Sequence, residues 1–466
     1  MNAASQLNLD KCLARVQALS NLRTIYLVWN ITLETINVSN PQEIWSADGS
    51  NIPEIKPHTK AKHQILDTYL ENLIYTLYGK GRYGETTFTF VDGFCGGGMY
   101  YDLDNETEWQ GSPIRMIEAI RAGYKKSKRE YDLNVKFIFI DNKLEHLACL
   151  KNYSMPKAGL GELVNGQPNE FRGEVGKLVE ECEFISGEFE NLINEVVFKI
   201  DIRKGHSFFF IDPYGWTDVS MQSIRKINSL KRTEILYTYM IDYLKRFLLG
   251  KSGKDKETFD KILEAEDYYK LSSFSIFERT GGQCYLRNES MRLFRDKGNA
   301  KYVFTFSMIP RGNVNVLYYL MHLSQKLTAL EVIKESFWQK NNLDYQYYFE
   351  LYGHGFKTAD FYEENQLELK FDITKNSEDF CLEKLDIHLG NIIRNNKDGI
   401  IFHELCHQTM ELNPASKKHY TTYINLLRNE KEIEIWRNGQ IVKGSKVDLQ
   451  RNDIIKLTGY KQLSFF

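Results

Sequence analysis

Acidic residues recur at the ends of apolar segments in the first half of the chain. Asp92 ends the apolar run TTFTFVD and opens a glycine-rich turn at 92–98, DGFCGGG. Because glycine has no Cβ, such a turn lets the backbone approach a ligand closely. Asp92 could accept hydrogen bonds from the turn or from a cofactor ammonium group. The candidate cofactor-binding residues here are Asp92, Gly93, Phe94, Gly96 and Gly98.

Two later strand ends carry similar residues. Asp141 ends the apolar run FIFID, and Glu188 follows the run CEFIS. A carboxylate at the first position can bind both ribose hydroxyls of an adenosyl group, and the adenine base would lie near the second. Open α/β sheets bind ligands at the edge formed by the carboxyl ends of their strands. The three strand ends therefore predict a nucleotide-cofactor site, with loop capping by Asp92 and Asp141 as the simpler alternative.

The spacing of these residues favours S-adenosyl-L-methionine (SAM) as the cofactor. No G-K-S/T follows the glycines, which argues against a phosphate-binding loop and NTP hydrolysis. A dinucleotide-binding turn has G-x-G-x-x-G and an acid roughly 20 residues further on. Here Asp141 lies 43 residues beyond Gly98.

The run HSFFFIDPYGW places Asp212, Pro213 and Tyr214 at the end of a fourth apolar segment. In amino-methyltransferases, an acid or amide, a proline and an aromatic at this position hold the target amine and stack on its base. Methyl transfer depends on alignment of the nitrogen, the methyl carbon and the sulfonium, so these three residues are the catalytic candidates. The alternative is an ordinary Asp-Pro turn. Enzymes acting on DNA or RNA usually have two prolines before the aromatic, and this chain has one.

The surrounding elements must form a scaffold that brings these strand ends together. The segment 58–81 has apolar residues at helical spacing, and Ser112 is a suitable N-cap for a helix that starts at Pro113. The apolar runs that predict strands are TTFTFVDGF, VKFIFID, CEFIS, HSFFFIDPYGW and TEILYTYMID, the last followed by a helix through Phe247. Near-continuous apolar strands separated by helices predict an α/β fold, a Rossmann-like, mostly parallel sheet with helices on both faces. Further on, KYVFTFSMIP predicts a late strand and 315–340 a long helix.

The chain divides by pattern into four parts. We predict an N-terminal extension at 1–57, a methyltransferase-like α/β domain at 58–340, a linker or insertion at 341–395 and a C-terminal module at 396–466. The last part reads as helix, turn with Ser416 as N-cap, helix, and a hairpin around Asn438-Gly439, which is a winged helix-turn-helix pattern.

The C-terminal module is basic, although the whole chain has a net charge of −2. Residues 415–466 contain ten Lys and Arg against five Asp and Glu. Lys417, Lys418 and Arg428 could contact nucleic-acid phosphates from the second helix. A solvated helix face or a protein-contact module would explain them as well.

Two other clusters have a simple and a functional interpretation. His403, Glu404 and His407 match the H-E-x-x-H zinc-protease pattern, but a short helix of the C-terminal module with no metal is the preferred interpretation, because no third ligand follows. His419 is more simply a residue of the basic helix. The cluster Lys60, Lys62 and His63 could border the cofactor pocket, but a solvated helix start is the simpler prediction.

The seven cysteines are scattered and include no C-x-x-C pair. With no signal peptide, this pattern predicts reduced thiols in a cytoplasmic protein. No apolar run is long enough to cross a bilayer, so we expect no membrane association.

At these residues the sequence resembles the three-Cys-motif partner protein (TcmP) family, a methyltransferase-like bacterial and phage group. The matching stretches are HTKAKHQILDTYL, FVDGFCGGGMY, GSPIRMIEAI, FFFIDPYGW and YYLMHLSQK, which span about 58–340. The resemblance implies a class I SAM-dependent methyltransferase-like fold, a winged-helix end and a partner, a three-Cys-motif protein that looks like a radical SAM enzyme. Cys95 stands where the family often has Ala.

Together these features favour SAM-dependent methylation of a nucleic acid or nucleotide. The alternative is a non-catalytic SAM-binding partner or regulatory subunit that recruits substrate through its winged helix. The single proline at Pro213 and the family's pairing with another protein favour this alternative.

Overall fold

The computed structural model describes residues 44–80, 85–172, 176–244, 253–270, 283–309, 316–341, 354–357 and 373–458. The chain divides into two compact units, 1–44 and 45–466, and the first lies outside the described residues except for Ile44. The helix expected through Phe247 is described only as far as residue 244. No helix among the described residues is long and apolar enough to span a membrane.

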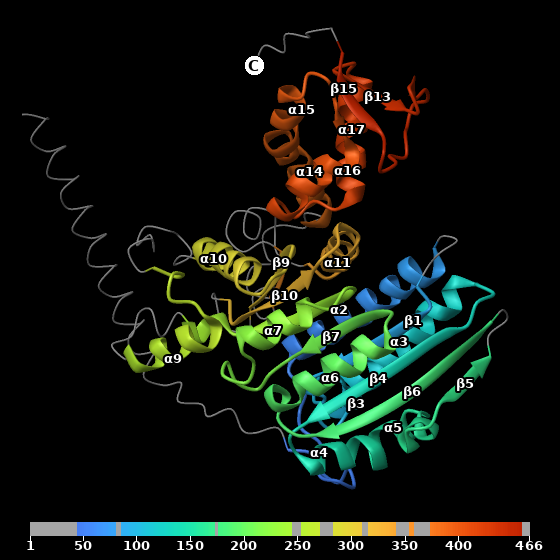
Figure 1. Ribbon diagram of the computed structural model, residues 1–466, viewed down its shortest axis with the longest axis vertical. Helices are drawn as coiled ribbons and strands as arrows, with labels where there is room; N and C mark the ends of the chain where they lie inside the picture. The colour runs from blue at the N-terminus through green and yellow to red at the C-terminus, as the bar shows by residue number, and fades with distance from the viewer. Residues whose placement is uncertain are drawn as a thin grey trace, which may run out of the picture. The chain divides into compact units, whose positions relative to one another are not determined.

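One large mixed sheet organises the chain (Figure 1). Its strands are β1 (Thr87–Asp92), β4 (Leu133–Asp141), β5 (Asn169–Arg172), β6 (Lys177–Ser186), β7 (His206–Ile211), β8 (Thr233–Tyr239), β9 (Tyr302–Ile309), β10 (Tyr318–Ser324) and β11 (His354–Lys357). In the described residues they are ordered β11-β9-β10-β8-β7-β1-β4-β6-β5. The strands β6, β4, β1, β7 and β8 are parallel, whereas β10 is antiparallel to both of its neighbours. The predicted α/β class with a mostly parallel central sheet is confirmed.

Alternating side chains of the central strands fill two separate cores. In β7, Phe208 and Phe210 belong to one buried cluster, and Phe209 and Ile211 belong to the other. Both faces of the strand are therefore buried, which explains its unbroken apolar run.

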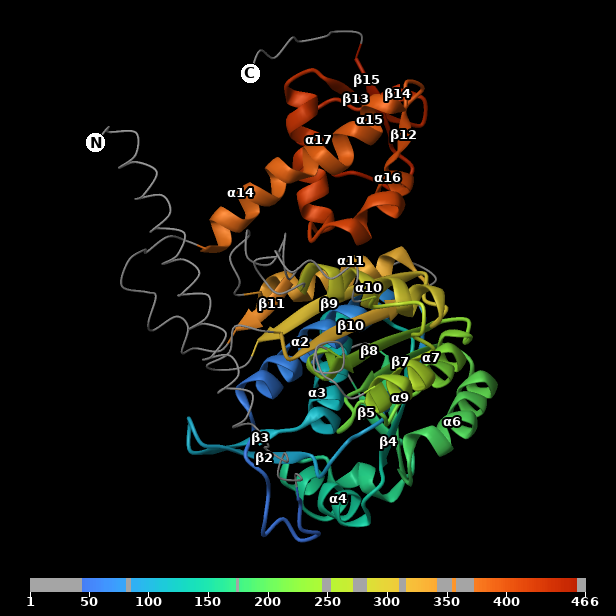
Figure 2. The same cartoon turned by 90° about the vertical axis from the view of Figure 1, so that its left-hand side faces the viewer.

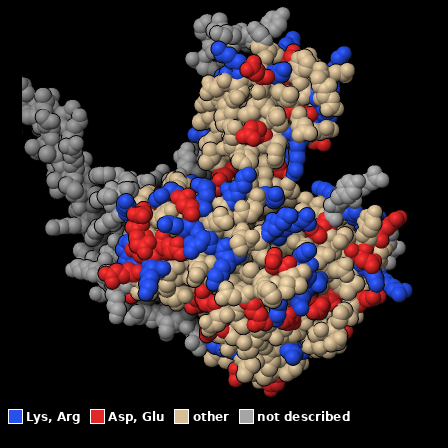
Figure 3. Space-filling model, viewed as in Figure 1, with Lys and Arg blue, Asp and Glu red and all other residues tan. Residues whose placement is uncertain are grey.

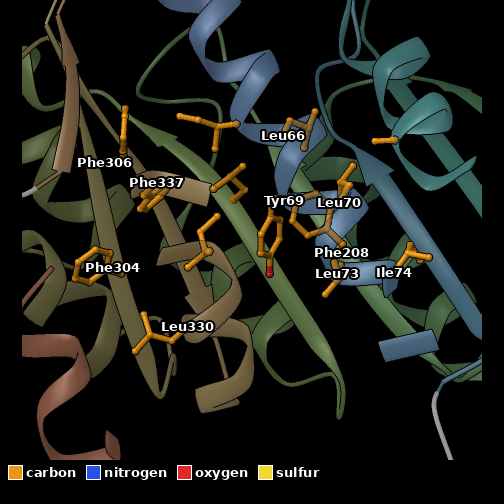
Figure 4. Packing of buried hydrophobic residues seen from close by; sticks show 14 of the residues in the cluster. Leu66, Tyr69, Leu70, Leu73, Ile74, Phe208, Phe304, Phe306, Leu330 and Phe337 are labelled. Carbon is orange, nitrogen blue, oxygen red and sulfur yellow. The ribbon is translucent and has the colours of Figure 1, made fainter. Parts of the chain in front are cut away.

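Helices cover both faces of the sheet, as Figures 1 and 2 show. The helices that share the core of Phe208 are α2 (Pro57–Ile74), α3 (Ser112–Ser127) and α11 (Leu327–Lys340). Those that share the opposite core are α6 (Phe189–Arg203), α7 (Met221–Asn228), α9 (Gly253–Leu263) and α10 (Gln283–Asp296). Figure 4 shows Leu66, Tyr69 and Leu70 of α2 packed near Phe208.

Short elements surround the glycine turn. A hairpin of β2 (Met99–Asp102) and β3 (Thr107–Gln110) follows the turn directly. After β4 come α4 (Leu144–Cys149), a π-helical turn (Leu150–Ser154), α5 (Met155–Lys157) and a 3₁₀ turn (Gly161–Asn165). A π-helical turn (Tyr75–Gly79) also ends α2. The sequence patterns gave no indication of the hairpin.

The long helix predicted over 315–340 is wrong in its first part. Residues 318–324 form the strand β10, and the helix α11 begins only at Leu327. Every residue of β10 is buried, because the strand lies inside the sheet between β8 and β9. A strand buried on both faces has no alternation of polar and apolar residues, so periodicity does not distinguish it from a buried helix.

Part of the irregular region expected at 341–395 is helical. The elements there are α14 (Ile373–Leu385), a π-helical turn (Asp386–Gly390) and α15 (Asn391–Asn395). Cys381, Leu385, Leu389 and Ile393 bury their side chains. The polar residues that suggested a linker cover one side of these short helices.

The C-terminal part follows its predicted order. It contains β12 (Ile400–Ile401), α16 (Phe402–Thr409), a 3₁₀ turn (Met410–Leu412), α17 (Lys417–Asn429), β13 (Ile433–Arg437), β14 (Gln440–Ile441) and β15 (Ile454–Leu457). The strands form a separate sheet in the order β12-β15-β13-β14. Ser416 caps α17 in a capping box with His419, and Asn438 and Gly439 have φ of 50° and 81° in the hairpin turn.

Candidate functional site

The candidate residues lie where the strand order of the sheet reverses. From β1 the chain passes to β4 and β6 on one side and then returns to β7 and β8 on the other. This reversal between β1 and β7 is the topological switch point at which open α/β sheets bind ligands. Asp92 ends β1, Asp212 directly follows β7, and Gly93 N donates to Phe210 O at 2.9 Å.

Asp92 is completely buried and only partly satisfied. Its Oδ1 accepts from the backbone N of Phe94 at 3.3 Å, and the carboxylate also interacts with the Ser112 hydroxyl. Its Oδ2 has no hydrogen-bond partner among the described residues. Burial, with smaller contributions from the charges of Asp212 and Asp141, raises the pKa of Asp92 to about 7. A cationic ligand at Oδ2 would favour the ionised carboxylate.

Ser112 therefore has a different role from the predicted one. It is the first residue of α3, and Gly111 is the N-cap. The hydroxyl of Ser112 helps to hold Asp92 instead of capping the helix.

Asp141 braces the glycine turn. Its Oδ2 accepts from Gly96 N at 3.0 Å, and its Oδ1 accepts from Lys143 N at 2.9 Å. His146 Nδ1 lies 3.0 Å from the same Oδ1, and both side chains are buried. Each carboxylate oxygen has a second lone pair, so Asp141 could still accept a ligand hydroxyl.

The space beside the glycines is filled by side chains of the chain itself. A Cβ on Gly97 would lie 2.2 Å from Trp45 Cγ, and one on Gly96 would lie 2.9 Å from Trp45 Cη2. A Cβ on Gly98 would lie 2.4 Å from Leu150 Cδ1. Trp45 is 1% exposed, and its Nε1 donates to Met99 O at 2.5 Å. Packing against Trp45 and Leu150 is thus sufficient to require glycine at these three positions.

The remaining cofactor candidates lie along the same edge. The ring of Phe94 lies 5.5 Å from that of Phe189, between centroids. Glu188 is exposed at the N-cap of α6, and its Oε1 accepts from Asn142 Nδ2 at 2.9 Å. Gly187 N donates to Asp141 O at 3.1 Å. These bonds hold the ends of β4 and β6 together.

Asp212 is engaged by a lysine that sequence reasoning placed in solvent. Lys62 Nζ lies 2.5 Å from Asp212 Oδ2, and the side chains of Lys62 and Asp212 are 7% and 20% exposed. Lys60 pairs with Asp102, and His63 is buried and accepts from Trp109 Nε1 at 3.1 Å. The prediction of a solvated helix start is therefore wrong.

The spacing of α2 contains the signal that would have placed Lys62 correctly. Lys62 precedes Leu66, Tyr69 and Leu73 by four, seven and eleven residues. These positions share one face of a helix, and that face packs on the sheet. A lysine in phase with a buried apolar stripe should be expected to reach a buried acid.

The other two catalytic candidates flank Asp212 differently. Pro213 is buried, whereas Tyr214 is 44% exposed. Gly215 N donates to Asp218 Oδ2 at 2.7 Å and closes the turn that carries Tyr214.

The basic residues proposed to contact nucleic acid lie on α17. Lys417 and Lys418 begin the helix, and Arg428 lies about 16 Å away along the axis, from the rise of an α-helix. Lys418 pairs with Glu378 at 3.2 Å, and Arg428 donates to Gly444 O. In the face that Figure 3 shows, Lys and Arg gather over α7 and α10 more densely than on the C-terminal part.

The H-E-x-x-H residues lie on α16, a helix as both interpretations expected. The ring of His407 packs edge-on against Tyr302, with centroids 5.6 Å apart. Within the described ranges, no group of three or more His, Cys, Asp or Glu side chains could hold a metal ion.

A cavity of about 890 Å³ lies away from the strand ends, beside α6. Among its charged residues, Lys136 and Lys199 both form ion pairs with Glu183. We therefore assign the candidate site to the switch point, where β1 ends in Asp92 and β7 is followed by Asp212, and not to this cavity.

No protein-family model matches the chain, and no curated protein matches it. The functional interpretation therefore depends on the site itself.

Proposed function

We propose that the α/β part of the chain binds SAM at the β1–β7 switch point and methylates a nucleic acid or nucleotide. The observation that carries this proposal is the unpartnered Oδ2 of buried Asp92, beside Asp141 and Asp212. Three carboxyl groups close to one another favour a cationic ligand. SAM carries both a sulfonium and an ammonium.

The residues present fit the parts of SAM. Asp92 Oδ2 could accept from the ammonium, and the free lone pairs of Asp141 could accept from the ribose hydroxyls. Phe94 and Glu188 lie along the edge toward β6, where the adenine is expected. Bound SAM would supply the electrophilic methyl group.

Asp212, Pro213 and Tyr214 would position the acceptor. Asp212 accepts hydrogen bonds, and exposed Tyr214 offers a face for a base to stack on. Positioning is the main catalytic contribution that such a site can make.

The proposal also covers the family of the α/β domain and the role of the C-terminal module. We propose that residues 58–340 are a TcmP-like methyltransferase domain that works with a three-Cys-motif, radical-SAM-like protein. We also propose that the C-terminal part is a winged helix that binds nucleic acid through Lys417, Lys418 and Arg428. Its order of α16, α17 and the β13–β14 hairpin supports this.

The pairing of Lys62 with Asp212 favours a second candidate, a SAM-binding subunit without transferase activity. In that case Lys62 permanently occupies the carboxylate of Asp212, which would otherwise hold the methyl acceptor.

Two measurements test these proposals. Isothermal titration with SAM should show binding, while NAD⁺ and ATP should not compete; absence of heat with SAM at high protein concentration would refute the cofactor proposal. Transfer of a radiolabelled methyl group to DNA, tRNA and protein fractions then separates enzyme from subunit. Asp212→Ala, which removes the group that accepts from the amine, should abolish transfer and retain SAM binding, since Asp212 is assigned to the methyl acceptor.

A further inference from the structure

Three polar side chains from distant parts of the chain meet beside the end of β7. Lys62 of α2 lies 2.5 Å from Asp212, measured from Nζ to Oδ2. The same Nζ lies over the ring of Tyr318 of β10, 5.1 Å from its centroid. The ring of His58 packs edge-on against Tyr318 at 5.6 Å.

Tyr318 leaves a buried hydroxyl without a partner. Its side chain is 6% exposed, and no described residue forms a hydrogen bond with its hydroxyl. Burial raises the pKa of Tyr318 well above its usual value, and Asp212 raises it further, so the phenol stays protonated and can donate. A buried donor without an acceptor is unfavourable and needs an explanation. A ligand acceptor would supply one.

The cluster presents complementary hydrogen-bonding groups side by side. Asp212 accepts, whereas Lys62 and Tyr318 donate. Lys62 has three N–H groups, and only one is needed for Asp212. A ligand that satisfies all three residues must offer a donor next to an acceptor.

We propose that Lys62, Asp212 and Tyr318 bind the donor–acceptor edge of an amino-substituted nitrogen heterocycle. The amine donates to Asp212, and the adjacent ring nitrogen accepts from Lys62 or the Tyr318 hydroxyl. Adenine offers this edge at N6 and N1, and cytosine offers it at N4 and N3. The inference rests on the proposed function, since the amine held by Asp212 is the methyl acceptor. Lys62 then determines specificity, and its pairing with Asp212 orients it for the ring nitrogen.

The test is titration of the full chain with nucleosides, with and without saturating S-adenosylhomocysteine. The purine probes are adenosine, purine riboside, which lacks the amine, and 1-deazaadenosine, which lacks the ring acceptor. The pyrimidine probes are cytidine, zebularine and 3-deazacytidine, which make the same comparison. We expect adenosine or cytidine to bind at least tenfold more tightly than both of its analogues.

The variant Lys62→Met identifies the donor. It should weaken binding of the intact nucleoside about tenfold and leave binding of the deaza analogue unchanged, because the lysine N–H and the ring nitrogen form one bond. Tyr318→Phe is the second variant and should show the same pattern if the hydroxyl shares that bond. Lys60→Met is the matched control, because Lys60 lies on the same helix but pairs with Asp102.

The outcomes separate this inference from the proposed function. Failure to bind S-adenosylhomocysteine would refute the cofactor proposal. The nucleoside titration without it would still measure whether the donor–acceptor edge of the base is recognised. Equal binding of intact and deaza nucleosides would overturn the inference. So would binding of no nucleoside, or an equal loss of both ligands in Lys62→Met, which would indicate a structural lysine.

Discussion

The two edges of the central sheet both bury charged residues, but they differ in how these are satisfied. At the amino-terminal edge, Glu234 of β8 occupies both carboxylate oxygens with protein groups: Tyr69 donates to Oε2, His322 Nε2 lies 3.2 Å from Oε2, and His206 Nε2 lies 3.1 Å from Oε1. At the carboxyl edge, Asp92 Oδ2 lacks a partner within the described part of the chain. Both carboxylates are buried, but only that of Asp92 keeps a buried oxygen with no hydrogen-bond partner among the described residues.

The environment of His206 supports this contrast. Burial lowers the pKa of His206 to about 3, so the imidazole is neutral at pH 7. In the amino-terminal cluster, Tyr69 and His322 form hydrogen bonds with Glu234, and the neutral ring of His206 lies beside its second carboxylate oxygen without a hydrogen bond. The carboxyl edge instead gathers three aspartates, and so differs in charge as well.

Removal of Glu234 should give the largest effect. Glu234→Ala deprives Tyr69 and His322 of their shared acceptor and leaves a small cavity beside His206. We expect a loss of about 3 kcal/mol in the free energy of unfolding, measured in urea. Exposed Glu145→Ala should change it by less than about 0.5 kcal/mol. A loss below about 1 kcal/mol for Glu234→Ala would show that Glu234 does not stabilise the fold through these contacts.

A methyl group in the glycine turn should have the next largest effect. Gly97→Ala places a Cβ 2.2 Å from Trp45 Cγ, and overpacking of this kind costs about 2 kcal/mol. In a Trp45→Ala background the same change should cost much less, because the two residues share one space. Additive losses in the double variant would mean that Trp45 does not pack on the turn.

Asp92→Asn should have a smaller effect of opposite sign. The pKa of about 7 for Asp92 in the folded chain lies above the ordinary aspartate pKa of 3.8. The folded chain therefore retains a proton that the unfolded chain loses, and stability falls as pH rises from about 4 to 7. Asparagine does not titrate, so this pH-dependent loss should be absent from the variant, which should gain at least about 1 kcal/mol of stability relative to the parent as the pH rises from 4.5 to 8. Asp132→Asn, at an exposed position, is the control. If Asp92→Asn is less stable than the parent at pH 8, the conclusion that Asp92 Oδ2 has no hydrogen-bond partner is contradicted.

The sequence predicted the ends of the parallel strands well. Asp92, Asp141 and Asp212 each end an apolar run, and a local rule is enough to place them on one edge. The same rule failed for β10, because Tyr318–Ser324 is buried on both faces and has no period to read. Residues 318–324 form a strand because they pair with β8 and β9, and the residue pattern within the segment does not show this pairing.

Contacts across long stretches of chain were beyond prediction. Lys62 and Asp212 are 150 residues apart in sequence, and Trp45 reaches the turn from residues 44–56, a described stretch that contains no helix or strand. The helical spacing of Lys62, Leu66 and Tyr69 predicts that the lysine is buried, but it does not identify Asp212 as the acid with which Lys62 pairs. The unpartnered atoms of Asp92 and Tyr318 are visible only in three dimensions.

The central claim is that Asp92 is the open carboxylate that receives a cationic cofactor. Its most direct test is titration of S-adenosylhomocysteine, which carries the ammonium, into the parent chain and Asp92→Asn at pH 6 and pH 8. We expect the parent to bind nearly tenfold more tightly at pH 8 than at pH 6, because a group with a pKa of about 7 ionises over this range. The variant should bind at least tenfold more weakly than the parent at pH 8 and show no such dependence. Equal affinity of parent and variant at pH 8, or no binding by either, would contradict the account.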